Sequence, residues 1–337
     1  MSSFSLRELK HRYVLFRDRT FLPCTVFCRN PLVLAVYDAD LLRNAPAFLA
    51  YFDSCRAKSI HVFVQLGWEH ETPKNSEPFA AGVKDMLSKC DRLRVTVLAN
   101  SENEVRVLSA LGLHTVFCHQ NAFVDESLYP IVPAEKKYDA IYIARLTPFK
   151  RHPLAEKIPS LRLVGGFAWL ESEKPYARDL LTNRLKHADW TSHVPARAIP
   201  GEIAKAHCGL CLSQAEGAMF VSIEYLLCGI PIVNTPNIGG RDGMFPDFAV
   251  KTVPDDPDAV AAAVREFVRN APRAEDIRAA TLEKMQAHRQ FFRELLNEAM
   301  APKRFPASRK LPHKLLLRRT PLPWQIPRYL ILRPRGL

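Results

Sequence analysis

The sequence predicts an α/β protein with two Rossmann-like domains, each built on a parallel sheet, and three observations support this. Strand-like and helix-like patterns alternate along the chain, which is typical of parallel sheets with helical crossovers. The alternation pauses once, at the charged, proline-containing stretch 130–137 (PIVPAEKK), and then starts again. The 337 residues are enough for two ordinary domains. We therefore expect domains at 1–133 and 134–300 that face a cleft, followed by a tail at 301–337.

The elements of the N-terminal half follow from short apolar runs and from helix-ending signals. We expect strands at 32–37 (LVLAVY), 60–66 (IHVFVQL), 94–99 (RVTVLA) and 115–119 (TVFCH). We expect the intervening helices at 41–56, about 78–90 and 102–111. Ser101 is a predicted N-cap with Glu104 three residues later, a spacing that favours a capping box. Gly112 is expected to end that helix.

The same alternation continues after the linker. We expect strands at 138–144, 161–164, 209–213, 230–234 and 249–252. We expect helices from about 150 and at about 170–187, 199–206, 219–228, 257–270 and 274–299. The last helix carries an apolar stripe, so we expect it to pack along one face.

Composition favours a cytoplasmic protein. The N-terminus, MSSFSLRELKHRY, is charged and has no apolar segment of the kind that a signal peptide needs. No apolar run approaches the roughly 18 residues of a spanning helix. The eight cysteines are therefore expected to stay reduced. Cys208 and Cys211 form a C-x-x-C within an apolar run, which we interpret as a buried strand and not as a metal or redox site.

The positive charge is concentrated in the tail. The chain carries a formal charge of +12, and residues 301–337 hold ten Lys/Arg and no Asp/Glu, so residues 1–300 carry +2 (12 − 10). Basic and apolar clusters alternate in this tail, with Trp324 and Tyr329 among them. We expect it to bind an anionic membrane surface, on the inner face of the cell membrane. A tail that is disordered or packed across the N-terminal domain is the main alternative, and nucleic-acid binding is less favoured.

Two clusters follow strands of the second domain. Glu216 and Gly217 come directly after strand 209–213, and Glu224 lies within the next helix. In a parallel sheet, ligands bind beyond the carboxyl ends of the strands, where a helix N-terminus favours an anion. Arg145 and Lys150 follow strand 138–144, five residues apart, and two cations at a strand end suit a diphosphate.

Both clusters resemble elements of retaining GT-B glycosyltransferases of the group 1 (family 4-like) type, here with a shortened N-terminal domain. The segment AEGAMFVSIEYLLCGIPIVN is similar to the family's E-x7-E element, E-G-F-G-x-x-x-x-E, with Ala218 and Met219 replacing its second small residue. The segment IARLTPFKRH is similar to G-R-L-x-x-x-K-G, with Ala144 in place of the first glycine and His152 in place of the last.

The resemblance implies sugar transfer from a nucleotide-diphosphate sugar, with retention of configuration and without a cofactor or metal. The implied acceptor is a cell-surface glycan or a lipid-linked precursor. The implied catalytic residues are Glu216, Arg145 and Lys150. The implied donor-binding residues are Gly217, Ala218, Met219, Phe220, Glu224, Val194 beside the nucleobase, and Gly166. His70 and Arg151 are further candidates, His70 facing the donor sugar and Arg151 as a second cation.

Other features of the sequence bear on alternative functions. Asp38-Ala39-Asp40 follows an apolar strand, and such a D-x-D holds a metal in GT-A glycosyltransferases; we interpret it as a loop and helix cap. No G-x-G-x-x-G follows a strand, and no G-x-x-x-x-G-K-[ST] occurs, which disfavours dehydrogenases and P-loop NTPases. The glycine-rich stretch 239–243 is expected to form a loop beside the cleft. A non-catalytic nucleotide-sugar-binding homologue or subunit remains the alternative function.

Overall fold

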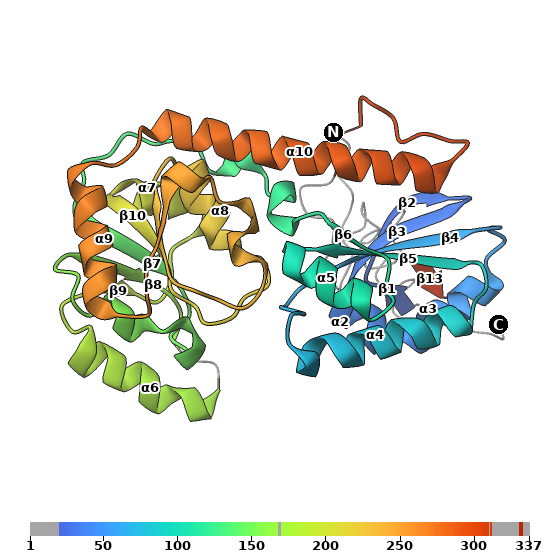
Figure 1. Cartoon of the computed structure of the whole chain (residues 1–337), viewed down its shortest axis with the longest axis horizontal. Coiled ribbons are helices and arrows are strands. Elements are labelled where there is room, and N and C mark those ends of the chain that lie inside the picture. Colours follow the sequence, from blue (N-terminus) through green and yellow to red (C-terminus); the bar gives the residue numbers. More distant parts are fainter. Residues whose placement is uncertain (1–19, 168–169, 310, 312–329, 333–337) are drawn as a thin grey trace, which may run out of the picture.

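The computed structural model describes residues 20–167, 170–309, 311 and 330–332. Two α/β halves lie side by side, each with its own sheet, and the long helix α10 (Ala274–Met300) runs along both (Figure 1). This arrangement of two Rossmann-like halves confirms the predicted fold class.

The N-terminal sheet has five strands in the order β2-β3-β4-β5-β6, and all neighbours are parallel except β2 and β3. The strands are β2 (Thr25–Arg29), β3 (Leu32–Tyr37), β4 (Ile60–Gln65), β5 (Leu93–Ala99) and β6 (Thr115–Phe117). The last four confirm the predicted strands to within two residues. The antiparallel strand β2 was not predicted, because its five residues alone give too short a pattern.

The helices of this half differ from the prediction where local chemistry intervenes. They are α2 (Asp38–Arg43), α3 (Ala45–Ser54), α4 (Pro73–Ser88) and α5 (Glu102–Ala110). The single helix predicted at 41–56 is two helices, because the chain turns at Asn44 and Pro46 starts a new helix. Ser101 caps α5 as predicted, accepting from Glu104 N at 3.0 Å. The Glu104 carboxylate does not close the capping box; it accepts from Asn100 N and His70 N.

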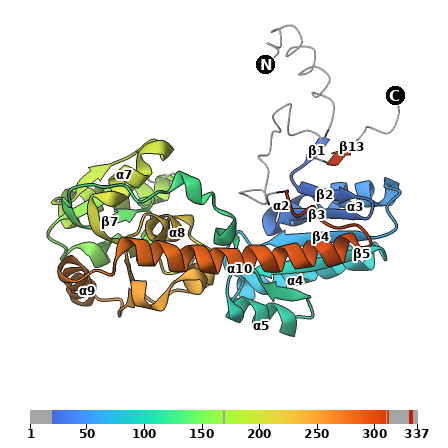
Figure 2. The same ribbon diagram turned by 90° about the horizontal axis from the view of Figure 1, so that it is seen from above.

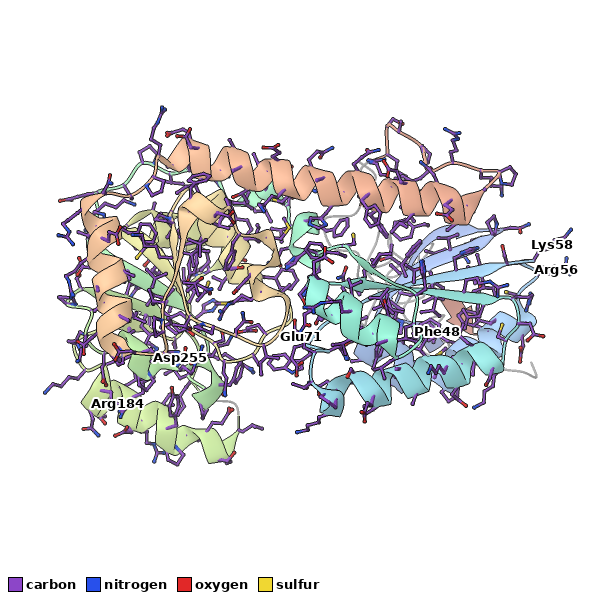
Figure 3. All side chains as sticks on the ribbon, in the orientation of Figure 1. Phe48, Arg56, Lys58, Glu71, Arg184 and Asp255 are labelled. Carbon is purple, nitrogen blue, oxygen red and sulfur yellow. The ribbon has the colours of Figure 1, made fainter. Side chains whose placement is uncertain are left out.

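A compact apolar core fills the space between this sheet and its helices. The β3, β4 and β5 residues alternate toward it, and Phe48 and Phe52 of α3 are completely buried in it. Figure 3 shows Phe48 inside this half, whereas the exposed Arg56 and Lys58 point away at its far end.

The C-terminal sheet has six parallel strands in the order β12-β11-β10-β7-β8-β9. The strands are β7 (Tyr138–Ile143), β8 (Leu161–Val164), β9 (Asp189–Thr191), β10 (Ala206–Cys211), β11 (Ile232–Asn234) and β12 (Val250–Thr252). The helices around it are α6 (Lys174–Asp179), α7 (Ile199–Ala204), α8 (Phe220–Leu227) and α9 (Pro257–Arg269). Cys208 and Cys211 are fully buried in β10 as free thiols, in agreement with the sequence prediction.

Two predicted helices of this half are wrong or too long. The helix expected from about 150 is absent, and two 3-10 turns, η3 (Pro148–Lys150) and η4 (His152–Ala155), take its place. Arg151 between them is left-handed, which interrupts a helix. The helix expected at about 170–187 is only α6 followed by a π turn at Leu180–Arg184.

Helix α10 connects the two halves through apolar contacts. The ring of Phe292, fully buried, packs edge-on against Phe27, Phe63 and Phe123 at 5.7, 5.3 and 5.4 Å between centroids. These three rings belong to the N-terminal half. The helix therefore starts against the C-terminal half and ends on the N-terminal one, as Figure 2 also shows.

Only parts of the basic tail lie within the described residues. Phe305 is buried and packs on Phe27 at 6.0 Å between ring centroids. Strand β13 (Leu330–Leu332) pairs antiparallel with β1 (Thr20–Leu22), beside the N-terminal half (Figure 2). Residues 310, 312–329 and 333–337, on which the membrane hypothesis largely rests, lie outside the described residues. In the part that is described, no helix combines the length and apolarity of a transmembrane span.

Candidate functional site

A cavity of about 500 Å³ lies at the carboxyl ends of the C-terminal strands, where the two halves meet. The segments that follow β7, β8 and β10 form most of its wall, and this is where a parallel sheet binds ligands. The N-terminal half contributes Gly67, Trp68 and Gln120. Of the predicted residues, the lining includes Arg145, Lys150, Gly166, Val194, Glu216, Gly217, Ala218, Met219 and Phe220.

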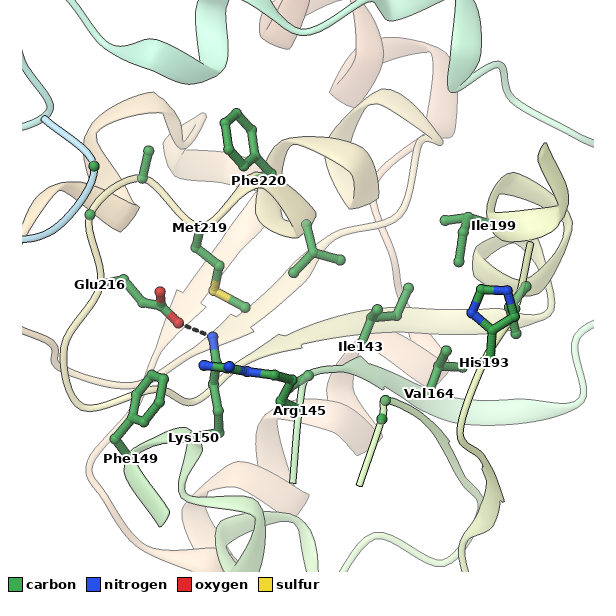
Figure 4. Close-up of a pocket in the computed structure, with 18 of the residues that line it drawn as sticks. Ile143, Arg145, Phe149, Lys150, Val164, His193, Ile199, Glu216, Met219 and Phe220 are labelled. Atoms are coloured by element: carbon green, nitrogen blue, oxygen red, sulfur yellow. Dashed lines mark hydrogen bonds and ion pairs between the residues drawn. The ribbon is translucent and has the colours of Figure 1, made fainter. Parts of the chain in front are cut away.

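One end of the cavity is charged. Lys150 Nζ and a Glu216 carboxylate oxygen form an ion pair, with 13% and 9% of the two side chains exposed. Arg145 lies next to them, so two cations and one carboxylate face the same space (Figure 4). The ring of Phe149 lies 5.1 Å from Lys150 Nζ and packs edge-on against Trp68. Two cations are suited to bind a diphosphate, and a carboxylate is suited to accept hydrogen bonds from hydroxyl groups.

The backbone around Lys150 is held from several sides. Tyr142 Oη donates to Lys150 O at 2.5 Å, and Gln214 N donates to Phe149 O at 2.8 Å. His152 is completely buried against the Tyr142 ring, and burial lowers the pKa of His152 to about 3. The neutral, buried ring of His152 thus packs against the turn that follows Lys150. These contacts hold the backbone that carries the Lys150 ammonium group.

Two residues with glycine-like backbone flank the site. Arg151 (φ 52°) and Met219 (φ 48°) are the non-glycine residues with positive φ in the described part of the chain. They stand where G-R-L-x-x-x-K-G and E-G-F-G have glycine. The sequence comparison assigned the last glycine of the first element to His152, and the structure corrects this to Arg151. A left-handed backbone costs about 1–2 kcal/mol for residues other than glycine. Both turns nevertheless have the left-handed conformation here.

The other end of the cavity is apolar. Val164, Ile143, Val194 and Ile199 line it, and the exposed His193 lies beside them (Figure 4). Gly165 must be glycine, because a Cβ there would lie 1.8 Å from Ala144 O. The wall at the end of β8 is therefore backbone, which leaves room for a flat group between apolar side chains.

Three predicted site residues do not line this cavity. Glu224 accepts a hydrogen bond from Tyr129 Oη at 2.7 Å. Arg151 pairs with Asp255 and donates to Pro236 O and Thr235 Oγ1, each at 2.8 Å, so it fastens neighbouring loops together.

The third of these residues, His70, is buried. Its Nε2 lies 2.7 Å from Asp38 Oδ2, and its Nδ1 lies 3.2 Å from Asn75 O. Asp38 also accepts from Ala39 N and Gly67 N, while Asp40 pairs with Arg43 at 3.7 Å. Asp38 and Asp40 thus lie in the first turn of α2, each with protein partners.

Sequence reasoning missed the N-terminal contribution to the cavity. Trp68 lies three residues after the end of β4, where a parallel sheet places ligand-facing residues, but a lone aromatic in a loop gives no motif. Gln120 also lines the cavity without belonging to any recognised pattern, and Phe149 stands at a variable position of the G-R-L-x-x-x-K-G element. The positions of Trp68 and Gln120 in the cavity depend on how the two halves meet.

The halves touch through backbone atoms beside the cavity. Asn121 Nδ2 donates to Ala218 O, and His119 Nε2 donates to Gly240 O, both at 2.8 Å. A Cβ on Gly240 would lie 2.1 Å from Asn100 Cβ. The predicted glycine-rich loop at 239–243 therefore lies beside the cleft, and its glycines allow this close approach.

Comparison with known proteins agrees with this geometry. Residues 129–284 match the family model described as glycosyl transferases group 1. This segment, which forms most of the C-terminal half, belongs to that family. No curated protein matches the chain.

Solved structures share its GT-B fold. HepE from Anabaena in complex with UDP is 19% identical, with a TM-score of 0.60 and 78% of each chain covered. A glycosyltransferase from Rickettsia africae is 13% identical, with a TM-score of 0.57, and the match covers 79% of this chain and 83% of that one. Sucrose-phosphate synthase from Thermosynechococcus elongatus is 18% identical, with a TM-score of 0.55, covering 76% and 79%. At these identities the likeness concerns the fold.

Proposed function

We propose that this chain transfers a sugar from a nucleotide-diphosphate sugar to a glycan or lipid-linked acceptor, with retention of configuration. The observation that carries this is the polarity of the cavity, with Arg145, Lys150 and Glu216 at one end and apolar side chains around Val194 at the other. A nucleotide sugar has the same polarity. That HepE has been solved with UDP and with UDP-glucose supports a UDP-sugar as the first donor to test.

In this proposal the half at 134–300 binds the donor and the half at 1–133 binds the acceptor. Arg145 and Lys150 hold the diphosphate and stabilise the charge that builds up on it as it leaves, which is often the largest catalytic contribution. Glu216 and the backbone of Gly217, Ala218, Met219 and Phe220 surround the donor sugar. Gly166 and Val194 border the base, and Glu224 binds the ribose.

The test is a turnover assay with UDP-, GDP- and dTDP-sugars and a variant at the diphosphate site. Arg145→Ala should lower turnover at least about tenfold, equivalent to ~1.4 kcal/mol. The exposed Arg178 of α6 supplies the control, and Arg178→Ala should behave as wild type. Turnover of Arg145→Ala within twofold of wild type would remove the diphosphate role. Donor binding without transfer by the wild type would instead support a non-catalytic nucleotide-sugar-binding homologue.

The same assay tests metal independence. Because side-chain cations and the α8 terminus face the cavity, we propose that transfer needs no divalent ion. Activity should persist in excess EDTA. Loss of activity that Mn²⁺ restores would contradict this.

We also propose that the enzyme is cytoplasmic and that the basic tail holds it on the inner face of the membrane, where a lipid-linked acceptor would lie. Each Lys or Arg near an anionic surface contributes about 1 kcal/mol. Flotation with liposomes of increasing anionic lipid content should carry the full chain, and salt should weaken it. Alanine substitution of Arg318, Arg319 and Arg328 should reduce flotation, and equal flotation of both proteins would contradict the proposal.

A further inference from the structure

We propose that Trp68 is the acceptor platform of this enzyme, on which one face of a pyranose ring of the acceptor stacks. This inference rests on the proposed function and adds a subsite on the N-terminal half. Trp68 lines the cavity, and 41% of it is exposed, so its ring is accessible to a ligand there.

The loop that presents Trp68 is held by hydrogen bonds on both sides of that residue. Gly67 N donates to Asp38 Oδ1 at 3.2 Å, and the same carboxylate holds His70 Nε2 at 2.7 Å. His70 N donates to Glu104 at 3.1 Å. The residues on both sides of Trp68 are thus fixed by hydrogen bonds to α2 and α5.

Glu69 strengthens the loop from the inside. Only 3% of it is exposed, and its carboxylate accepts from Glu71 N, Thr72 N and the Thr72 hydroxyl at 2.9, 3.1 and 2.8 Å. These bonds hold the segment that leads into α4. In the segment 67–70, the polar side chains therefore point inward, and the Trp68 side chain is directed to the cavity.

Contacts with the other half place Trp68 beside the reacting end of the donor site. A Cβ on Gly217 would lie 2.9 Å from Gly67 O and 3.3 Å from Trp68 Cα, so the turn after Glu216 rests on this loop. The Trp68 ring meets Phe149, the neighbour of Lys150, at 5.7 Å between centroids. Trp68 is accordingly next to Glu216 and Lys150, but on the opposite half of the molecule.

The chemistry of this side chain selects a sugar ring. One face of many pyranoses carries C–H groups with partial positive charge, and the face of an indole ring is negative and apolar. Gln120 of the same half also lines the cavity, its Oε1 accepts from Tyr37 Oη at 3.4 Å, and it offers a polar group for hydroxyls. The cationic donor anchors belong to the C-terminal half, so the ring on Trp68 belongs to the acceptor.

The first experiment separates acceptor from donor effects. Kinetics are measured with a UDP-sugar that the wild type turns over and a panel of p-nitrophenyl α- and β-D-glucosides, galactosides, mannosides and N-acetylglucosaminides. Trp68→Ala should raise the acceptor KM at least tenfold, and Trp68→Phe should recover part of the loss. The UDP dissociation constant from calorimetry should stay within twofold. The control is Phe248→Ala, since Phe248 is an exposed aromatic residue that does not line this cavity.

The second experiment does not require turnover. Saturation-transfer difference NMR on the UDP-loaded protein should give signals from the ring C–H protons of a bound glycoside in wild type and Phe248→Ala, and much weaker signals in Trp68→Ala. An unchanged acceptor KM, a weakened UDP affinity, or no glycoside bound by the wild type would overturn the proposal. Glycoside binding that depends on Trp68 without any transfer would overturn the proposed function and leave the platform in place.

Discussion

At the residue scale, the Lys150–Glu216 pair sets the electrostatics of the site. Both side chains are largely buried, so each charge compensates the other at a place where an unpaired charge would be costly. In the proposed function, an incoming diphosphate would supply a second anion to Lys150. Glu216 would then be released from the pair and accept hydrogen bonds from sugar hydroxyls. We therefore expect Glu216 to compete with the donor phosphates for Lys150 before binding and to contact the donor sugar after it.

This competition leads to a prediction for Glu216→Gln. Transfer should fall at least about tenfold, ~1.4 kcal/mol, whereas UDP binding should be unchanged or tighter, because Lys150 no longer has a carboxylate partner. Calorimetry with UDP and a turnover assay measure the two effects. A parallel loss of UDP affinity and turnover would contradict the competition.

Glu224 gives a second prediction at this scale. Its carboxylate already accepts from Tyr129 Oη, so ribose hydroxyls would have to replace or extend that bond. Glu224→Ala should weaken UDP binding, and Tyr129→Phe should leave it equal or stronger because the competing hydroxyl is gone. Calorimetry with UDP distinguishes them. Wild-type affinity in Glu224→Ala would remove the ribose assignment.

At the element scale, the loop between β4 and α4 depends on a pH-sensitive bond. Burial is the largest single influence and opposes the charged form of His70, but the hydrogen bond and charge of Asp38, the charge of Glu104 and the hydrogen bond to Asn75 together outweigh it, so the pKa of His70 is raised. A raised pKa means that the bond contributes fully below the unfolded pKa of about 6.5 and is lost as pH rises through the folded value. Glu104 gives the stability the same pH dependence, because burial raises the pKa of Glu104 to about 7 and its contribution is lost as pH rises through that value.

We therefore expect His70→Gln to cost more stability at pH 6 than at pH 9. Urea unfolding at several pH values measures the difference from wild type. His114→Gln is the control, since His114 is exposed on the same half. A difference that grows as pH rises would show that the sign is wrong.

The end of helix α10 provides a prediction about packing. Phe292→Ala would leave a cavity among Phe27, Phe63 and Phe123 and should cost about 3–5 kcal/mol. Gln286→Ala, at an exposed position of the same helix, should be nearly neutral. Denaturant unfolding gives both values. A loss below about 1 kcal/mol for Phe292→Ala would mean that α10 does not hold the N-terminal half.

At the scale of the whole molecule, the halves are joined by close backbone contacts beside the cavity and by α10 across the back. His119 is fully buried between them, and burial lowers its pKa to about 3. Its neutral ring accepts from Asn121 N and donates to Gly240 O, so one tautomer serves both halves. The described parts of the tail contact the N-terminal half, because Phe305 is buried there and β13 pairs with β1.

Features that depend on residues close together in the chain could be predicted from the sequence. Apolar runs located most strands, Ser101 marked a helix start, and the spacing of Arg145, Lys150 and Glu216 indicated an anion site at strand ends. The strands and the Ser101 cap are confirmed. Arg145, Lys150 and Glu216 line one cavity, and the anion site there stays a prediction. Such signals are local because a strand, a cap or a turn is specified within a few residues.

Contacts between side chains that lie far apart in the chain follow from the tertiary structure alone. It paired Glu216 with Lys150, Glu224 with Tyr129 and His70 with Asp38. The fold also brings Trp68 into the same cavity as Lys150 and Glu216, and it places the end of α10 on the N-terminal half. A polar or aromatic side chain has many possible partners of equal chemistry along the chain. The packing of the two halves selects among them, because burial makes an unpaired polar group costly and rewards close contact between apolar ones.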